Sequence, residues 1–155
     1  MRKMRREERL MSVEETEEYL TEETWGVLSV LGDDGFPYGV PMNYAWSDGT
    51  IILHCTSGTS HRLDALRKNN KVCFTVVPVH AIDRENWSTV YASVIIFGRA
   101  EIIEAKEEKI DAIKAFMQVL SPEKLEESFG VCDPGKAELV MIRIHPERIT
   151  GKKST

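Results

Sequence analysis

Apolar and polar residues cluster and alternate along the chain in a pattern that predicts about six strands and a few helices. A short apolar run, Trp25–Leu31, is expected to form a buried strand, and the turn residues Gly32–Gly35 join it to a second strand at Phe36–Trp46. Four more strands are expected, at Thr50–Cys55, Lys71–Val77, Thr89–Glu104 and Ala137–His145. Because most connections are short, the pattern favours a mainly β fold, a small antiparallel barrel with flanking helices.

Three helices are expected, and a fourth, short one starts at Ser121-Pro122-Glu123. Ser12, with Glu15 three residues later, is typical of a capping box and opens a helix at Val13–Leu20. A second helix starts after Thr59 or Ser60, and a third spans residues 105–120 with apolar positions on one side. Residues 79–88 show no period and are expected to form a loop, whereas Gly98 within its long strand pattern indicates a bulge or bend.

The second strand has two unlike faces. Its even positions are large and mostly apolar, and its odd positions are small or lack a backbone donor: Tyr38, Val40, Met42, Tyr44 and Trp46 against Pro37, Gly39, Pro41, Asn43 and Ala45. Since proline cannot donate to a ladder, one interpretation is an edge strand at a barrel rim. The other is a flat platform for a planar ring, with backbone groups near residues 41–43 free to pair with it.

A candidate anion site lies at the start of the second helix. His61 and Arg62 fall in its first turn, where the helix dipole disfavours cations and free N–H groups favour anions. The hydroxyls of Ser57, Thr59 and Ser60 precede them, and the planar fork of Arg62 matches phosphate oxygens. The alternative is that Asp64 and nearby carboxylates neutralise these two cations on a solvated face.

Composition and charge narrow the function classes. A chain of 155 residues is expected to form one domain, with residues 1–10 as a loose N-terminal arm. A net charge of −5 argues against a sequence-independent nucleic-acid binder. No apolar run approaches the roughly 20 residues of a membrane span, and the basic N-terminus lacks the apolar segment of a signal peptide. We therefore expect a cytoplasmic protein without membrane or nucleic-acid partners.

Metal binding and nucleophilic catalysis are not indicated. The three cysteines, at positions 55, 73 and 132, are widely spaced without a CxxC, as expected for reduced thiols. His54, Cys55, His61 and Cys73 match no zinc spacing, so no metal is expected, and a Cys55–His61 nucleophile pair would need the fold to assemble it. The chain also lacks the glycine-rich phosphate loops of P-loop and Rossmann proteins.

Several motifs, taken together and in order, resemble a known family. These are GFPYGVPMNY from residue 35, HC at 54, HRLDALRKNNKVCFTV from 61, ASVIIFGRAE from 92 and ITGK from 149. From residue 26 to residue 152 the chain resembles the nitroimidazole-resistance branch of the pyridoxamine 5′-phosphate oxidase-like flavoproteins. The resemblance implies a six-stranded antiparallel split β-barrel, a homodimer, and FMN bound in clefts at the dimer interface.

The resemblance also implies roles for individual residues. The cofactor-binding set comprises Pro41, Met42, Asn43, His54, Cys55, Thr56, Ser60, His61, Arg62, Ser93, Val94 and Lys152. In that set, residues 41–43 line the isoalloxazine ring through their backbone, and His54 and Cys55 flank the ribityl chain. His61 and Arg62 hold the phosphate, Ser93 and Val94 approach from the long strand, and Lys152 closes the site across the interface.

The function implied is that of a small FMN-dependent oxidoreductase. A hydride from NAD(P)H would pass through the flavin to a small acceptor such as a nitroaromatic, which needs no catalytic acid–base pair from the protein. The segment Arg143–Arg148 lacks the spacing and the nearby tryptophan of true pyridoxamine 5′-phosphate oxidases, so that activity is less favoured. The alternatives are a non-catalytic flavin sensor, a haem-handling split barrel that uses His54 or His61, and a deazaflavin-dependent reductase.

Overall fold

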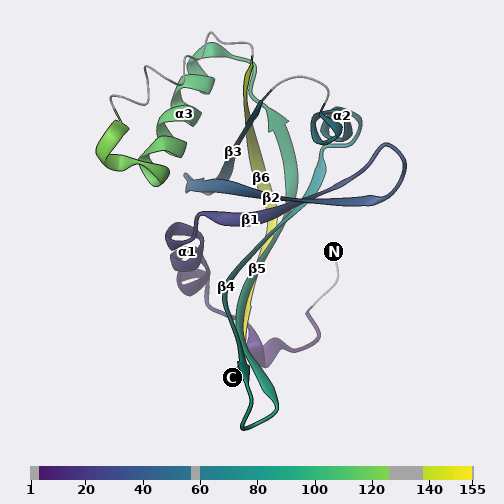
Figure 1. Ribbon diagram of the computed structural model, residues 1–155, viewed down its shortest axis with the longest axis vertical. Coiled ribbons are helices and arrows are strands. Elements are labelled where there is room, and N and C mark those ends of the chain that lie inside the picture. Colours follow the sequence, from purple (N-terminus) through teal and green to yellow (C-terminus); the bar gives the residue numbers. More distant parts are fainter. Residues whose placement is uncertain (1–3, 57–59, 126–137, 155) are drawn as a thin grey trace.

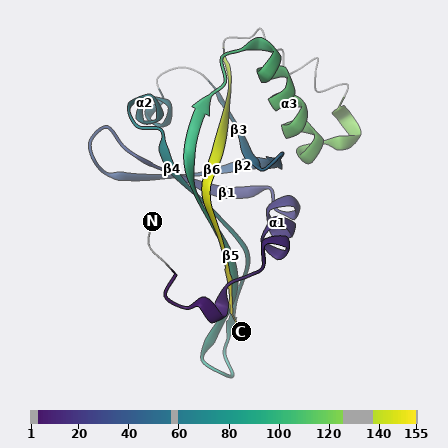
Figure 2. The same ribbon diagram turned by 180° about the vertical axis from the view of Figure 1, so that it is seen from behind.

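Six antiparallel strands dominate the computed structural model, which describes residues 4–56, 60–125 and 138–154. They are β1 (Trp25–Leu31), β2 (Pro37–Ser47), β3 (Thr50–Thr56), β4 (Lys71–Asp83), β5 (Ser88–Ile102) and β6 (Leu139–Lys153). The strands close a barrel in the order β1-β2-β3-β6-β5-β4, with β1 paired to β4 at the closure (Figures 1 and 2). The mainly β, split-barrel fold class is thus confirmed.

Three α-helices lie around the barrel: α1 (Val13–Glu22), α2 (His61–Lys68) and α3 (Lys106–Leu120), with short 3₁₀ turns at Glu7–Arg9 and Pro122–Lys124. The predicted cap of α1 is present, because Ser12 Oγ accepts a hydrogen bond from the Glu15 amide at 3.1 Å. Figure 1 shows α3 beside β3 and α2 on the side toward which the turn of the β1–β2 hairpin extends, where Lys68 of α2 donates to the Asp33 carbonyl at 3.4 Å. Among the described residues, no helix is long and apolar enough to cross a membrane.

The barrel interior is the main hydrophobic core. Its largest fully buried side chains include Tyr44 of β2, Phe74 of β4 and Leu28 of β1, and α2 adds Leu63 and Leu66. A second cluster lies outside the barrel wall, where α3 packs on β2, β3 and β6; it contains Ala45, Ile52, Met141, Ala112, Ile113 and Phe116. Because α3 covers only these strands, the outer faces of β1, β4 and β5 must be covered otherwise or remain exposed.

The prediction of a loop at residues 79–88 is wrong. The chain stays in β4 to Asp83, turns over four residues and returns as β5 from Ser88, forming the long hairpin at the bottom of Figure 1. The pairing register of β4 and β5 shifts between Val76 and Val79. Pro78 lies at this shift, where its missing N–H leaves no hydrogen bond of the ladder unmade. The hairpin forms because cross-strand pairing overrides the weak local pattern of this segment.

The last strand is also longer than expected. It continues from Leu139 through Pro146 to Lys153, and residue 137 lies outside the described part of the chain. A register shift between Phe97 and Gly98 accommodates the proline. Gly98 lies at this bulge, as the sequence indicated, and the extra residue of the bulge is Glu147 on β6. A Cβ at Gly98 would collide with the backbone carbonyl oxygen of His145.

Part of the arm expected to be loose is held against β6. Leu10 forms an isolated β-bridge with Lys152, and the amide of Met11 donates to the carbonyl of Gly151 at 3.1 Å. Met11 itself is buried at 8% exposure. Residues 7–11 thus follow the edge of β6, an arrangement that sequence periodicity does not predict because the contact joins opposite ends of the chain.

We expect Tyr44→Phe to destabilise the barrel by about 1–2 kcal/mol. The buried Tyr44 hydroxyl donates to the carbonyl of Leu20 at 3.0 Å, and Leu20 lies in the last turn of α1, where carbonyls lack helical partners. Urea unfolding measures the loss. Tyr19→Phe is the matched control, because Tyr19 lies on the same helix and its hydroxyl forms no hydrogen bond within the described residues. It should change stability far less, and equal losses would contradict this account.

Candidate functional site: the gap between β2 and β3

A gap in the barrel wall arises because β2 changes partners along its length. Residues 37–43 pair with β1 alone, and pairing with β3 begins only at Tyr44 opposite Leu53. The far end of β3, residues 54–56, pairs only with β6. The two prolines of β2 therefore lie where one edge of the strand is unpaired, as the edge-strand interpretation predicted.

Arg62 extends from the first turn of α2 into this gap. Its Nη1 lies 3.7 Å from Met42 Sδ on β2, and its positive charge offsets part of the rise that burial causes in the pKa of the Cys55 thiol on β3. The Nε atom is buried and has no hydrogen-bond partner among the described residues. A buried, charged donor without an acceptor is costly, so this position favours an anion.

The electrostatics of neighbouring groups reflect the same cation. Burial lowers the pKa of His54, and the charge of Arg62 lowers it further, which favours the neutral imidazole. Burial raises the pKa of the Cys55 thiol, and Arg62 only partly offsets this effect. Cys55 therefore stays a thiol near neutral pH, and the positive charge in the gap is not cancelled by a thiolate.

His61, the other predicted phosphate ligand, points to the β1–β2 turn. Its Nε2 lies 3.0 Å from Asp33 Oδ1, and its ring stacks on Tyr38 with a centroid separation of 4.7 Å. The Ser60 hydroxyl accepts from the Leu63 amide at 3.4 Å and so caps α2. Asp64 pairs with Arg67 and leaves Arg62 alone. Ser57 and Thr59 lie outside the described residues.

The platform residues of β2 alternate as expected. Met42 points inward and is 6% exposed, whereas Pro41 is exposed and Asn43 is half-buried on the outer side. The Asn43 side chain donates to the carbonyl of Thr24 at 3.3 Å, which fixes the strand against the end of α1. Residues 41–43 thus border the gap through an unpaired backbone edge, the geometry that the platform interpretation requires.

The predicted residues of β3 fall on opposite sides of the wall. His54 points outward under α3, with its ring 4.8 Å from that of Phe116, while Cys55 is buried inside and Thr56 is exposed at the end of the strand. Cys73 lies on the outer side of β4, and Cys132 is outside the described residues. The fold therefore does not assemble His54, Cys55, His61 and Cys73 into one metal site, nor Cys55 and His61 into a nucleophile pair.

The predicted residues of β5 and β6 lie farther along the barrel. Ser93 pairs in register with Lys152, and the two side chains share the outer face. Val94 is fully buried, so only its backbone is available to a ligand. Because Arg62 projects from the opposite end of the sheet, one chain does not bring Arg62 and Lys152 together, and these assignments remain predictions.

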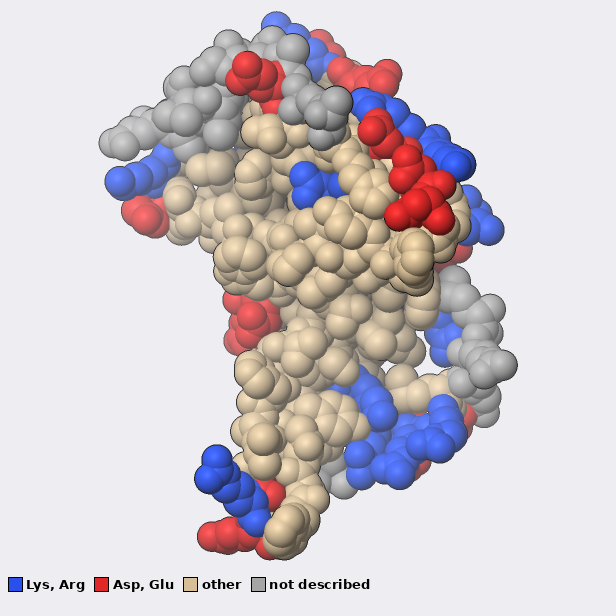
Figure 3. Space-filling model, turned by 45° about the vertical axis from the view of Figure 1, so that its right-hand side comes forward, with Lys and Arg blue, Asp and Glu red and all other residues tan. Residues whose placement is uncertain are grey.

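The outer faces of β2, β1, β4 and β5 form a continuous surface that no described helix covers. Two rows of paired residues cross it: Pro41, Val27, Thr75 and Ile95, then Gly39, Ser29, Cys73 and Phe97. We call these eight residues the outer apolar face. Val27, Ile95 and Phe97 are 36–41% exposed, and a broad, largely uncharged surface occupies the middle of Figure 3. Patches of this kind usually mark an interaction site.

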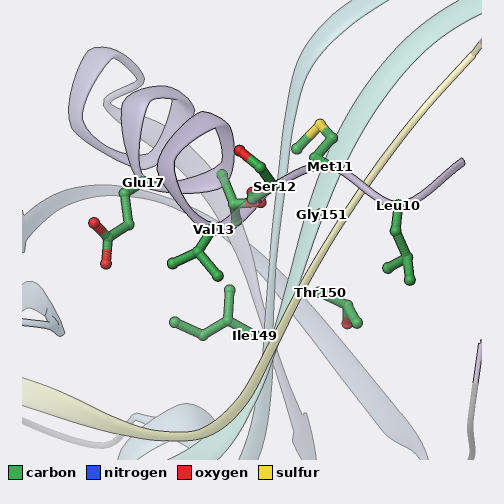
Figure 4. A pocket seen from close by; sticks show the side chains of 9 residues that line it. Leu10, Met11, Ser12, Val13, Glu17, Ile149, Thr150 and Gly151 are labelled. Carbon is green, nitrogen blue, oxygen red and sulfur yellow. Dashed lines mark hydrogen bonds between the residues drawn. The ribbon is translucent and has the colours of Figure 1, made fainter.

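The cavities within a single chain are small. One of about 110 Å³ lies between the N-terminal arm, α1 and β6, where Leu10, Val13 and Ile149 line it (Figure 4). Another, of about 160 Å³, lies between α3 and the outer side of β3 beside His54. Cofactor pockets usually measure about 300–1,000 Å³, so neither cavity encloses a cofactor by itself.

Comparison with known proteins identifies the family. The family model described as pyridoxamine 5′-phosphate oxidase matches residues 12–153, which includes every strand and the gap. This chain belongs to the pyridoxamine 5′-phosphate oxidase family. No curated protein matches it significantly.

Solved structures share the fold of this family member. A candidate 5-nitroimidazole antibiotic resistance protein from Bacteroides thetaiotaomicron VPI-5482 is 24% identical with a TM-score of 0.78, the match covering 94% of this chain and 86% of that one. A FAD-binding protein from Mesorhizobium loti is 27% identical with a TM-score of 0.69, covering 95% and 98%. The flavocytochrome Anf3 from Azotobacter vinelandii is 19% identical with a TM-score of 0.82, covering 99% and 72%.

The lowered pKa of His54 predicts that the folded protein is less stable at acidic pH. The unfolded chain takes up the proton at the ordinary pKa of 6.5, before the folded state does, so the free energy of unfolding falls as pH drops from 6.5 through the folded pKa. Urea unfolding at neutral pH and at about pH 5.5 should show this fall. His54→Gln should lose that part of the slope, whereas His80→Gln, in the hairpin of β4 and β5 away from α3, should keep it. An unaltered slope in His54→Gln would contradict the assignment.

Proposed function

We propose that this protein is an FMN-binding oxidoreductase with the FMN phosphate held by Arg62 in the gap between β2 and β3. The observation that carries the proposal is the buried, unpartnered Nε of Arg62, which needs an acceptor. A phosphate supplies several, and the planar guanidinium can donate to two of its oxygens at once. The residues present therefore fit a phosphorylated cofactor.

Related proteins support a flavin as that cofactor. The Mesorhizobium loti structure is named as a FAD-binding protein, and the Azotobacter vinelandii structure as a flavocytochrome. We propose FMN rather than FAD because Arg62 is a single cation beside a flat strand, and FMN ends in a single phosphate that such a cation can bind. Gly39, which has no side chain, and the compact ring of Pro41 leave room for a planar ligand to approach that strand.

The proposal includes a homodimer. The outer apolar face is too exposed and too continuous to suit a monomer, and burying it against a second copy would stabilise both chains. A second copy would also supply what one chain lacks, since the cavities are small and Ser93 and Lys152 lie far from Arg62 on the barrel. The ring side of each cleft is proposed to be completed by Ser93 and Lys152 of the other copy.

The chain's own residues would bind and orient, and the cofactor would supply the redox chemistry. When bound, FMN allows a hydride from NAD(P)H to be passed to a small acceptor such as a nitroaromatic. Arg62 would fix the phosphate end, and the inward side chains of Met42 and Cys55 would exclude water around that ion pair. Excluding water strengthens the attraction between guanidinium and phosphate.

Arg62→Gln should weaken FMN binding by about tenfold to a hundredfold, because a charged hydrogen-bond donor to phosphate is lost. Quenching of FMN fluorescence measures the Kd. Arg67→Gln is the matched control, since Arg67 lies on the same helix but pairs with Asp64 at 3.0 Å. If Arg62→Gln holds FMN as tightly as wild type, the phosphate assignment is wrong.

The absorption spectrum and turnover of the purified protein separate the alternatives. Flavin bands, with NAD(P)H oxidised only when a nitroaromatic is added, are the expected result. A flavin spectrum without turnover would favour a sensor, a Soret band would favour a haem protein, and a colourless protein that takes up no FMN would refute the proposal.

Val27→Glu should dissociate the proposed dimer, because it places a charge in the centre of the outer apolar face. Analytical ultracentrifugation should show a monomer, and FMN binding should weaken together with dimerisation. Val13→Glu is the control, an exposed valine on α1 outside that face. A wild-type monomer that binds FMN fully would overturn the shared site.

A further inference from the structure

Three side chains from distant parts of the sequence meet where the N-terminal arm lies against β6 and β5. Arg9 Nη1 donates to the Tyr91 hydroxyl oxygen at 3.2 Å, and Lys152 Nζ lies 5.5 Å from the centre of the Tyr91 ring. The three belong to the N-terminal arm, β5 and β6. All are half-buried, so they are partly withdrawn from water but still reachable.

The backbone around this cluster holds it in place. The bridge between Leu10 and Lys152 fixes the arm on β6 immediately after Arg9. On the other side, Tyr91 and Ser154 exchange hydrogen bonds, the Ser154 amide donating to the Tyr91 carbonyl at 2.8 Å and the Tyr91 amide to Ser154 Oγ at 3.2 Å. The N-terminal arm on one side and β5 on the other therefore fix β6 around Lys152, so backbone hydrogen bonds position the cluster.

The cluster contains donors without matching acceptors. Because the Tyr91 oxygen accepts from Arg9, the Tyr91 hydroxyl hydrogen is directed elsewhere and can donate. Lys152 adds an ammonium group, and Ser93, its partner in register, adds a hydroxyl on the same face. Among the described residues, no carboxylate forms an ion pair with Arg9 or Lys152. The adjacent Lys153, in contrast, is paired with Glu15 at 2.7 Å.

We infer that Arg9, Tyr91 and Lys152 form a second anion site, which binds the phosphate or carboxylate of the molecule that exchanges electrons with the flavin. The inference rests on the proposed function, since Tyr91 lies two residues before Ser93 on the same face of β5, and Ser93 is assigned to the ring side of the cleft. Hydrogen bonding from Arg9 lowers the pKa of Tyr91, with a further contribution from Lys152, and a more acidic hydroxyl is a stronger donor to an oxyanion.

The site is separate from the phosphate position at Arg62. Arg62 lies at the gap between β2 and β3, while this cluster lies beside the arm on β5 and β6. In the proposed dimer, Lys152 of each copy would then bind the anionic group of the reacting molecule at the ring side of the cleft. Anionic donors or acceptors would be preferred to neutral molecules of the same shape.

Inorganic phosphate is the first probe, and it needs no turnover. The protein has four tyrosines, so labelling them with carbon-13 at Cζ gives few signals, and the spectrum of Tyr91→Phe assigns the one from Tyr91. Phosphate added to the FMN-loaded protein at constant pH and ionic strength should shift that signal saturably. Binding should weaken at least about tenfold in Arg9→Gln and in Lys152→Gln, and Lys153→Gln, which removes an equal charge one residue away, should leave it unchanged.

The controls separate failure of this inference from failure of the proposed function. No saturable shift, or an equal loss in Lys153→Gln, overturns the anion site. If Arg9→Gln loses FMN as Arg62→Gln does, the cluster belongs to the flavin phosphate and the second site is refuted. If the protein binds no FMN at all, the proposed function fails, while phosphate titration of the flavin-free protein still decides whether the three residues bind an anion.

Two kinetic comparisons identify the source of the anion. If the cluster binds the hydride donor, Arg9→Gln should reduce the preference for NADPH over NADH. If it reads the acceptor, Arg9→Gln should raise KM for para-nitrobenzoate about tenfold while leaving para-nitrobenzamide unchanged. Equal effects on all four compounds would show that the cluster does not recognise the reacting molecule.

Discussion

The early end of β2–β3 pairing is the constraint on which the rest of this structure depends. A barrel normally satisfies every backbone edge, yet residues 37–43 of β2 have a partner on one side only. Two prolines in this segment reduce the number of unpaired donors. The same gap admits α2, whose Leu63 and Leu66 pack into the core and place Arg62 at the opening. The candidate site is therefore a consequence of how this barrel is closed.

The strict alternation of side chains across the wall gives the barrel two unlike outer halves. Where α3 packs, the outward residues are buried, as Ala45 and Ile52 are; across β1, β4 and β5, Val27 and Ile95 remain exposed. Apolar residues on both faces of a strand indicate that both faces are meant to be covered. Within the described chain only one half is covered, and the proposed dimer would cover the other.

The sequence predicted the fold where local rules decide it. β1 begins and ends where its apolar run does, Ser12 caps α1, and the bulge at Gly98 follows from a lone glycine in a strand pattern. It failed where pairing with a distant strand decides, at residues 79–88 and beyond Pro146, since neither segment has a strong pattern of its own. In the site, residue types indicated an anion near His61 and Arg62, but only the packing shows that Arg62 alone faces the gap.

The contact between Arg9 and Tyr91 was beyond prediction for the same reason, because 82 positions separate the two residues. The chain carries a net charge of −5, and some of its cations are paired with carboxylates, as Arg99 is with Glu147 and Arg143 with Glu108. A half-buried cation with no carboxylate beside it is free to pair with an anionic ligand. Arg62, Arg9 and Lys152 are such cations, and each stands beside a surface that a second copy of the chain would cover. The proposed dimer would account for both the charge pattern and the exposed apolar face, because the second copy would cover that face and complete a site for anionic ligands at these cations.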